Sequence, residues 1–182
     1  MLPIGPLMIE HRLIERMVAV MKVELARIER EVKIDHEFIS IATDFIRSYA
    51  DRCHHGKEEG ILFLELGKKR LTGEHQKIMD ELVEEHRWGR KTTFKLVDAD
   101  KKYAEGDKAA LLAIIECMKS LIEFYPRHIE KEDRQFFLPA MDYFTDQEKA
   151  TMLKDEYEFD RTLIHEKYRA IVIEAEKATT PL

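Results

Sequence analysis

Amphipathic helical periodicity is the feature that most restricts how this chain can fold. Apolar residues recur every three or four positions through four long stretches, at about residues 7–31, 35–71, 72–103 and 107–141. Glycine and proline, which interrupt helices, number only seven and five among the 182 residues. The sequence therefore predicts an all-α protein rather than a turn-rich β fold.

Short breaks separate the predicted helices. Asp35 has the side chain expected of an N-cap for the second helix, and Thr72 that expected for the third. The third helix is predicted to stop at about residues 103–106, and Asp107 is predicted to cap the fourth. Because short connections make consecutive helices antiparallel, the predicted architecture is an up-down-up-down four-helix bundle.

The C-terminal part of the chain continues the helical pattern. After a break at residues 142–146, a fifth helix is predicted over about residues 147–178, packed outside the bundle or against a second subunit. Neither a linker nor a low-complexity tract divides the sequence. We therefore predict a single domain over residues 1–182, with a bundle core at about residues 7–143 and an additional C-terminal helix.

Charge and cysteine usage restrict the partners and the compartment. The formal net charge of −6 argues against nucleic acid as a partner, since phosphate binding needs a basic face. No run of about 18 apolar residues is present, so no membrane span is predicted, and the N-terminus lacks the basic and apolar regions of a secretory signal. Cys53 and Cys117 form neither a metal motif nor a disulfide framework. The sequence thus predicts a cytoplasmic protein that binds neither nucleic acid nor membranes, with a homo-oligomer or a redox partner protein left open.

An internal repeat carries the chemistry. Residues 54–63 and 128–137 both read His-x-x-Lys-Glu-acidic followed by an apolar and aromatic pair, and they lie on the second and fourth predicted helices. The histidine and glutamate of each repeat are four residues apart, which places them on one helix face about 5.4 Å apart. These pairs are His54 with Glu58 and His128 with Glu132. Each pair can present an imidazole and a carboxylate to the same point inside a bundle.

The other two helices can supply further ligands. The first helix contains His11 and the third contains His86. Together with the two repeats they bring four imidazoles and two carboxylates from four helices, a donor set that can hold two divalent ions. Burial of so many polar side chains without an ion would cost about several kcal/mol. A metal site is therefore predicted.

The motifs resemble those of the hemerythrin-like, or HHE cation-binding, family over about residues 8–143. The resemblance rests on Glu10-His11, on the two repeats with their trailing Leu62-Phe63 and Phe136-Phe137, and on Glu85-His86. It implies two iron ions per chain in a four-helix bundle, with an oxo or hydroxo bridge as one form of the pair. The implied metal ligands are His11, His54, Glu58, His86, His128 and Glu132. The implied small-molecule partner is O2 or NO, in oxygen binding, oxygen or redox sensing, nitric-oxide responses or iron handling.

One departure from the oxygen-carrying members of that family affects the expected function. Those proteins have a second ligand histidine one turn from the histidine of the third helix, whereas Leu82 and Arg90 occupy the positions four residues either side of His86. Six ligands instead of seven would leave the metal pair more open. We therefore expect oxygen or redox sensing, or small-molecule redox chemistry of an oxidoreductase kind, with reversible oxygen carriage and iron storage or delivery as alternatives.

The residues beside the first repeat allow a second alignment. His55 and Glu59 are also four apart, but they are rotated by about 100° from His54 and Glu58 in an α-helix. Alignment with the second repeat favours His54 and Glu58 as ligands, which leaves His55 next to the site or in a channel toward it. Glu59 and Asp133 are then expected to hold ligand imidazoles through their outer N–H groups.

Two other metal sites fit the sequence less well. A ferritin-type di-iron site needs Glu-x-x-His on two helices. The only acidic residue three positions before any histidine is Asp51, before His54. Structural zinc favours clustered cysteines, and Cys53 and Cys117 are far apart in the sequence.

Overall fold

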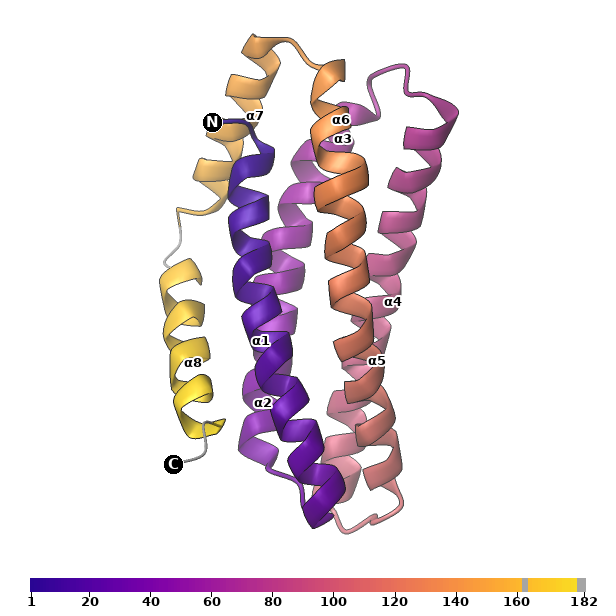
Figure 1. Ribbon diagram of the computed structural model, residues 1–182, viewed down its shortest axis with the longest axis vertical. Helices are drawn as coiled ribbons and strands as arrows, with labels where there is room; N and C mark the ends of the chain where they lie inside the picture. The colour runs from indigo at the N-terminus through magenta and orange to yellow at the C-terminus, as the bar shows by residue number, and fades with distance from the viewer. Residues whose placement is uncertain (162–163, 180–182) are drawn as a thin grey trace.

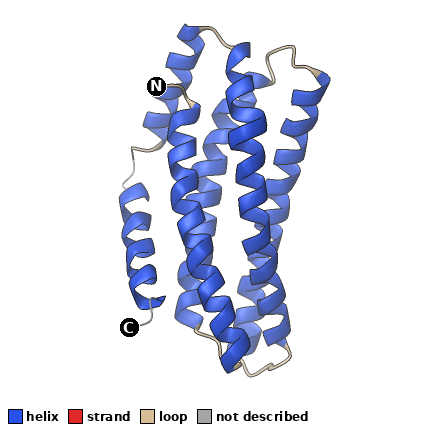
Figure 2. Cartoon of the chain, in the orientation of Figure 1, coloured by secondary structure: helices blue, strands red, loops and turns tan. Residues whose placement is uncertain are grey.

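The computed structural model describes residues 1–161 and 164–179, and all of the regular structure in these ranges is helical. The first bundle helix is α1 (Ile4–Glu31). The second consists of α2 (His36–Phe45), η1 (Ile46–His55), η2 (Glu58–Leu62) and α3 (Phe63–Leu66). The third is α4 (Gly73–Ala104), and the fourth consists of α5 (Ala110–Lys131), η3 (Glu132–Phe136), α6 (Phe137–Ala140) and η4 (Met141–Tyr143). These four rods run up, down, up and down, as predicted (Figures 1 and 2).

The starts of the helices test the predicted caps. The side chain of Asp35 accepts a hydrogen bond from the backbone N–H of Phe38, and that of Thr72 accepts one from His75, so both predicted caps are confirmed. The fourth helix begins later than predicted, at Ala110. Asp107 instead accepts a hydrogen bond from the backbone of the residue two positions on, at 3.0 Å, within the preceding turn.

The predicted C-terminal helix over residues 147–178 is divided in two. Its first part is α7 (Asp146–Phe159), which begins with a capping box made by Thr145 and Glu148. Its second part is α8 (Ile164–Thr179), which lies alongside α1 (Figure 1); residues 162–163 of the predicted helix lie outside the described residues. The helix α7 ends at Phe159, and the carboxylate of the next residue, Asp160, binds Lys57 of the bundle.

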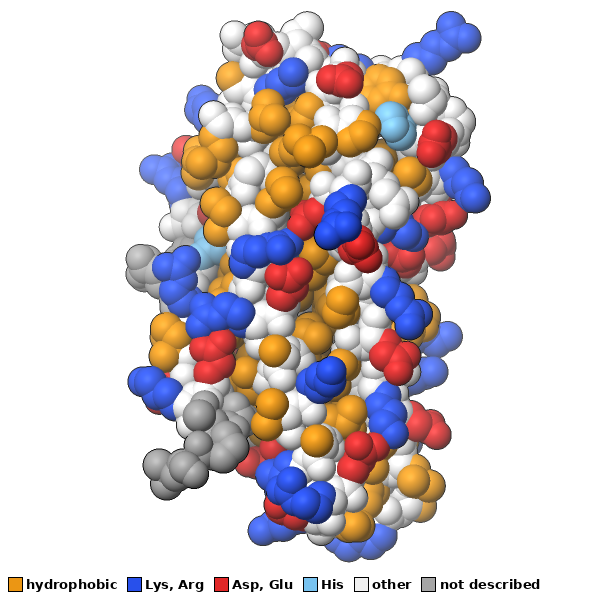
Figure 3. All heavy atoms as spheres, viewed as in Figure 1, with side chains coloured by type: hydrophobic (Ala, Val, Ile, Leu, Met, Phe, Trp, Pro, Cys, Tyr) orange, Lys and Arg blue, Asp and Glu red, His pale blue; other side chains and the backbone are white. Residues whose placement is uncertain are grey.

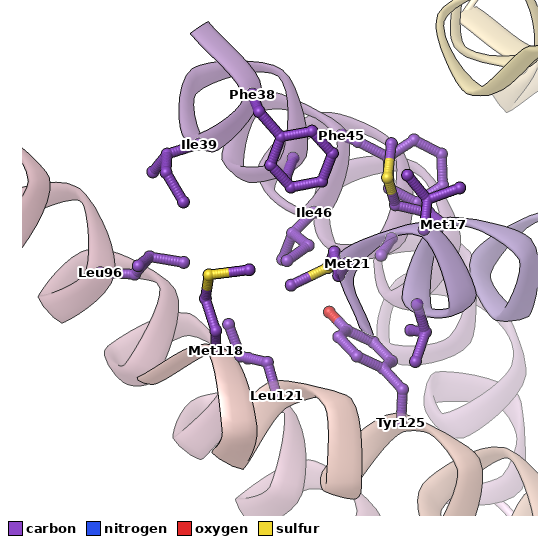
Figure 4. Close-up of a cluster of buried hydrophobic side chains, with 14 of the residues drawn as sticks. Met17, Met21, Phe38, Ile39, Phe45, Ile46, Leu96, Met118, Leu121 and Tyr125 are labelled. Carbon is purple, nitrogen blue, oxygen red and sulfur yellow. The ribbon is translucent and has the colours of Figure 1, made fainter. Parts of the chain in front are cut away.

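The core consists of two apolar clusters, one toward each end of the bundle. The larger cluster, drawn in part in Figure 4, takes residues 13–28 of α1, 38–50 of the second rod, 96–99 of α4 and 114–129 of the fourth rod. The smaller cluster takes residues 4–7, 62–66, 79–82 and 136–144 of the same four rods. In every rod a stretch is left between the two clusters, and these stretches contain five of the six predicted metal ligands, while the sixth, His128, lies directly before Ile129 at the edge of the larger cluster. The bundle therefore has a polar layer between its two apolar clusters.

The outer surface carries charged side chains of both signs (Figure 3). On the face formed by α1 and α5, lysine and arginine side chains alternate with aspartate and glutamate (Figure 3). Within the described residues, no helix combines the length and the apolar character needed to cross a membrane.

Candidate metal centre

The six predicted ligands converge in the polar layer, where they form two groups together with His55. One group is His11, His54, Glu58 and Glu132, and the other is His55, His86 and His128. Within each group one donor atom per residue lies within 4.8 Å of the others, and every member is at most 3% exposed. The four rods thus bring five imidazoles and two carboxylates into one buried space.

The two glutamates connect the groups, because each has one oxygen near each of them. In Glu132, Oε2 lies 3.1 Å from Nε2 of His11 and Oε1 lies 3.2 Å from Nε2 of His128. In Glu58, Oε1 lies 3.4 Å from Nε2 of His54 and Oε2 lies 3.3 Å from Nε2 of His86. This arrangement allows each carboxylate to bridge two ions, one in each group.

Four of the five histidines are oriented by a carboxylate outside the groups. Nδ1 is hydrogen-bonded to Asp133 in His11 (2.8 Å), to Glu10 in His54 (2.8 Å), to Glu59 in His86 (2.7 Å) and to Glu85 in His128 (2.7 Å). When Nδ1 donates to a carboxylate, the lone pair of Nε2 is free to face the interior, which is the tautomer that a metal needs. Glu59 and Asp133 therefore lie where the sequence placed them. The sequence did not assign this role to Glu10 and Glu85. Each directly precedes a histidine in the sequence, which is the signal that could have identified them. Each nevertheless binds a histidine of another rod, namely His54 and His128.

The inward-facing atoms have no other partner. Among the described residues, Nε2 of these four histidines and all the carboxylate oxygens of Glu58 and Glu132 are buried without a hydrogen bond. Unsatisfied buried polar groups are rare and cost about 1–3 kcal/mol each, more when charged. Metal ions would satisfy these atoms together, so the donor set fits a pair of cations.

His55 corrects one expectation from the sequence. It was placed next to the site or in a channel, but its ring stacks on His86 with centroids 3.8 Å apart and planes 12° apart, and both of its nitrogens lack a hydrogen bond. The expected position of His55 beside the site followed from the 100° rotation between neighbouring residues of an α-helix. The segment η1 is a π-helix, whose i→i+5 hydrogen bonds change the rotation between neighbouring side chains, so adjacent histidines reach different groups. His55 therefore lies against His86 within the second group.

The π-helical segments coincide with the candidate ligands. His54 and His55 end η1, while Glu58 begins η2 and Glu132 begins η3. π-Bulges are rare and are often found at functional sites. The π-helical backbone thus lies on the second and fourth rods, within the two repeats or directly before the first of them.

Comparison with known families agrees with this geometry. A family model described as the hemerythrin HHE cation binding domain matches residues 2–138. The chain belongs to the hemerythrin family. A comparison with curated proteins and a comparison with solved structures give no match. The family and the two His/Glu groups together indicate a cation-binding domain.

Burial and mutual proximity shift the pKa values of the acidic and histidine side chains in this hemerythrin-like centre. Burial and the neighbouring Glu132 raise the pKa of Glu58 well above its ordinary value. Burial also acts to raise the pKa of Glu132, but His128, His11 and His86 outweigh it and hold that pKa well below the ordinary value. Burial and the charge of His11 lower the pKa of His54 to about 4. Metal binding would displace the protons that these side chains hold without a metal, because ligands bind as neutral imidazoles and ionised carboxylates.

The lysine of each repeat has a defined structural role. Lys131 donates to Glu85 at 2.5 Å, and Glu85 in turn holds His128. Lys57 donates to Glu10, and Glu10 holds His54 at 2.8 Å. In both repeats, therefore, the lysine steadies the carboxylate that orients the histidine three residues before it.

The first repeat has an additional contact with the C-terminal helices. Both oxygens of Asp160 lie 2.7–2.8 Å from Nζ of Lys57. His165 of α8 approaches the same carboxylate, with Nε2 3.0 Å from Oδ1 of Asp160. A continuous series of polar contacts thus runs from His54 through Glu10 and Lys57 to the end of α7.

Proposed function

We propose that this domain binds two iron ions and acts in oxygen or redox sensing. The ligands of one ion are His11 and His54, those of the other are His55, His86 and His128, and Glu58 and Glu132 bridge the two. The observation that carries the proposal is the set of buried donor atoms without hydrogen bonds in the two groups. Imidazole and carboxylate donors suit iron, and the family is one that binds cations.

The two ions would have unequal coordination, since one has three imidazoles and the other has two. A small diatomic molecule, O2 or NO, would bind at the ion held by His11 and His54, where fewer protein donors occupy the coordination sphere. When bound, the iron pair supplies the capacity to bind such a molecule and to change oxidation state. In this proposal the protein acts in the cytoplasm as a metal-binding protein rather than a dedicated enzyme.

The contacts of His54 support sensing. The series Glu10, Lys57 and Asp160 joins this candidate ligand to the end of α7, outside the bundle. A change in the charge or position of the metal pair would therefore act on the C-terminal helices through buried ion pairs, which weaken little in salt. The reporting element in this proposal is the pair α7 and α8.

Reversible oxygen carriage is the second candidate. The sequence argued against it because only six ligands were expected, but His55 would be a seventh donor, since it stacks on His86 within the second group. The main reason against reversible oxygen carriage is thereby weakened. The reaction of the iron-loaded protein with oxygen distinguishes carriage from sensing.

The test begins with anaerobic reconstitution of the full chain with ferrous iron. Elemental analysis should find about two ions per chain, and one ion or none would contradict the proposal. The ferrous protein is then exposed to air and purged with argon while the charge-transfer bands are recorded. Sensing predicts lasting oxidation and altered protease cleavage after Asp160, whereas full return of the ferrous spectrum over repeated cycles, with unchanged cleavage, would favour carriage.

A further inference from the structure

A cavity of about 370 Å³ lies between the second rod and α4, and His55 forms part of its wall. Several lining residues are buried, among them His55 at 3% and Tyr125 at 2% exposure, whereas Arg47, Arg52 and Phe94 are exposed. The cavity therefore runs from the surface toward the three-histidine side of the metal centre. Its volume is within the range of small-molecule sites, roughly 300–1,000 Å³, and far exceeds the ~30 Å³ that a molecule the size of water occupies.

The outer part of the cavity is cationic. Arg90 is already paired, with Asp51 at 2.7 Å and with Glu59 at 2.6 Å. Within residues 1–161 and 164–179, Arg47 and Arg52 have neither an ion-pair nor a hydrogen-bond partner. Two unpaired guanidinium groups at one opening, in a chain with a net charge of −6, favour an anionic ligand.

The inner part of the cavity offers a hydrogen-bond donor. The Tyr125 hydroxyl has no hydrogen-bond partner among the described residues, although the side chain is almost fully buried. Figure 4 shows its oxygen directed toward the side of Met21 and Ile46, and Ile46 also lines the cavity. Burial raises the pKa of Tyr125, so the hydroxyl remains protonated and can donate. Buried tyrosine hydroxyls usually find a partner, and a ligand that reaches this depth would supply one.

Apolar side chains connect the two polar ends. Ile46, Val97 and Phe94 line the cavity, and Phe94 is 74% exposed although it is large and hydrophobic. An apolar wall with a few polar groups is typical of sites for small organic molecules. A flat aromatic or branched body would bury this surface, and an inorganic anion would not.

We infer that this cavity binds a small organic acid, with its carboxylate at Arg47 and Arg52, its apolar body against Ile46, Val97 and Phe94, and a hydrogen-bond acceptor near Tyr125. The bound acid lies against the wall formed by His55 and does not coordinate the metal. Occupancy of the cavity therefore does not depend on which ion the centre holds.

The probe is 4-hydroxybenzoate, and the neutral analogue of the same shape is 4-hydroxybenzyl alcohol. Titration calorimetry on the iron-loaded full chain should detect binding of the acid and at least tenfold weaker binding of the alcohol. The double variant Arg47→Gln/Arg52→Gln should weaken the acid at least tenfold. The matched double variant Arg70→Gln/Arg127→Gln removes the same charge from exposed residues outside the cavity and should leave the affinity unchanged.

Tyr125→Phe tests the inner end, because it should weaken 4-hydroxybenzoate several-fold and benzoate little. Iron content and thermal melting of each variant establish that the fold and the centre remain intact. Absence of acid binding, equal affinity in the Arg47→Gln/Arg52→Gln protein, or a shift of the charge-transfer bands that persists in that variant would each overturn the inference. The same titration on metal-free protein separates the two proposals. If the chain binds the acid but fails to take up two iron ions, only the proposed di-iron centre is contradicted.

Discussion

The two repeats of the metal centre have the same local design but different surroundings. In the first, Lys57 steadies Glu10, which orients His54; in the second, Lys131 steadies Glu85, which orients His128. The side chain of Lys57 is 0% exposed and has Asp160 as a further partner, whereas that of Lys131 is 22% exposed and has Glu81. The helix α7 contacts the first repeat, and Asp160 at its end binds Lys57, so this ion pair is a buried contact whereas that of Lys131 is a surface contact.

This difference changes what the same residue contributes. Removal of one partner from a buried ion pair leaves an uncompensated charge, whereas exposed pairs contribute little because solvent screens them. The bridging role is shared by both repeats, but coupling to the C-terminal helices belongs to the first alone. Four predictions test this distinction.

The largest effect is expected where the repeats are equivalent. Glu58→Ala and Glu132→Ala should each abolish binding of the metal pair, because each carboxylate contacts both groups. Glu59→Ala should weaken metal binding by about 10–100-fold, since it only orients His86, and the exposed Glu15→Ala should leave it unchanged. Elemental analysis after reconstitution provides the measurement. Two ions in Glu58→Ala with an empty Glu59→Ala would mean that the bridging role is assigned to the wrong residue.

The lysines should separate the repeats. Lys57→Ala should destabilise the metal-free protein by about 3–5 kcal/mol, because Glu10 and Asp160 then remain buried near each other without a cation. Lys131→Ala should cost about 1 kcal/mol or less. Urea unfolding of both variants gives the comparison. Equal losses would show that α7 does not seal the first repeat.

The orienting glutamates should affect metal affinity almost equally. Glu10→Gln and Glu85→Gln each keep a hydrogen-bond acceptor for Nδ1 but remove its charge, and we expect about a tenfold loss of metal affinity in both. Only Glu10→Gln should also loosen α7, because it alone shares Lys57 with Asp160. Competition with a chelator measures the affinity, and limited proteolysis after Asp160 reports on α7. Accelerated cleavage in both variants would contradict a specific link to the first repeat.

The last prediction is a pH dependence that arises from α7. Glu156 is buried without a hydrogen-bond partner among the described residues, and burial raises its pKa to about 8. Between the ordinary glutamate value of about 4.3 and pH 8 the folded state keeps a proton that the unfolded state has lost, so stability falls as pH rises, by at most about 1.4 kcal/mol per pH unit. Glu156→Gln should remove this slope, and the exposed Glu15→Gln should not. Denaturant unfolding from pH 5 to pH 8 measures it, and parallel slopes in wild type and Glu156→Gln would refute the assignment.

Much of the fold and most of the centre could be predicted from local patterns. The four rods follow from helical periodicity, and Asp35 and Thr72 cap their helices because an N-cap depends only on the next few residues. The pairs His54/Glu58 and His128/Glu132 were found because residues four apart share a helix face. Such features are determined within one or two turns of chain, and the sequence by itself specifies them.

Tertiary structure decided the remainder. Glu10 reaches His54 across 44 residues and Lys57 reaches Asp160 across 103, and no local spacing encodes which rods lie side by side. The inclusion of His55 depended on the π-helical register of η1, which α-helical periodicity cannot describe. The predicted C-terminal helix is interrupted after Phe159, where Asp160 binds the buried ammonium group of Lys57 in another part of the fold. The contacts of Glu10 with His54 and of Lys57 with Asp160 join distant segments of the chain, so they exist only after the bundle has assembled.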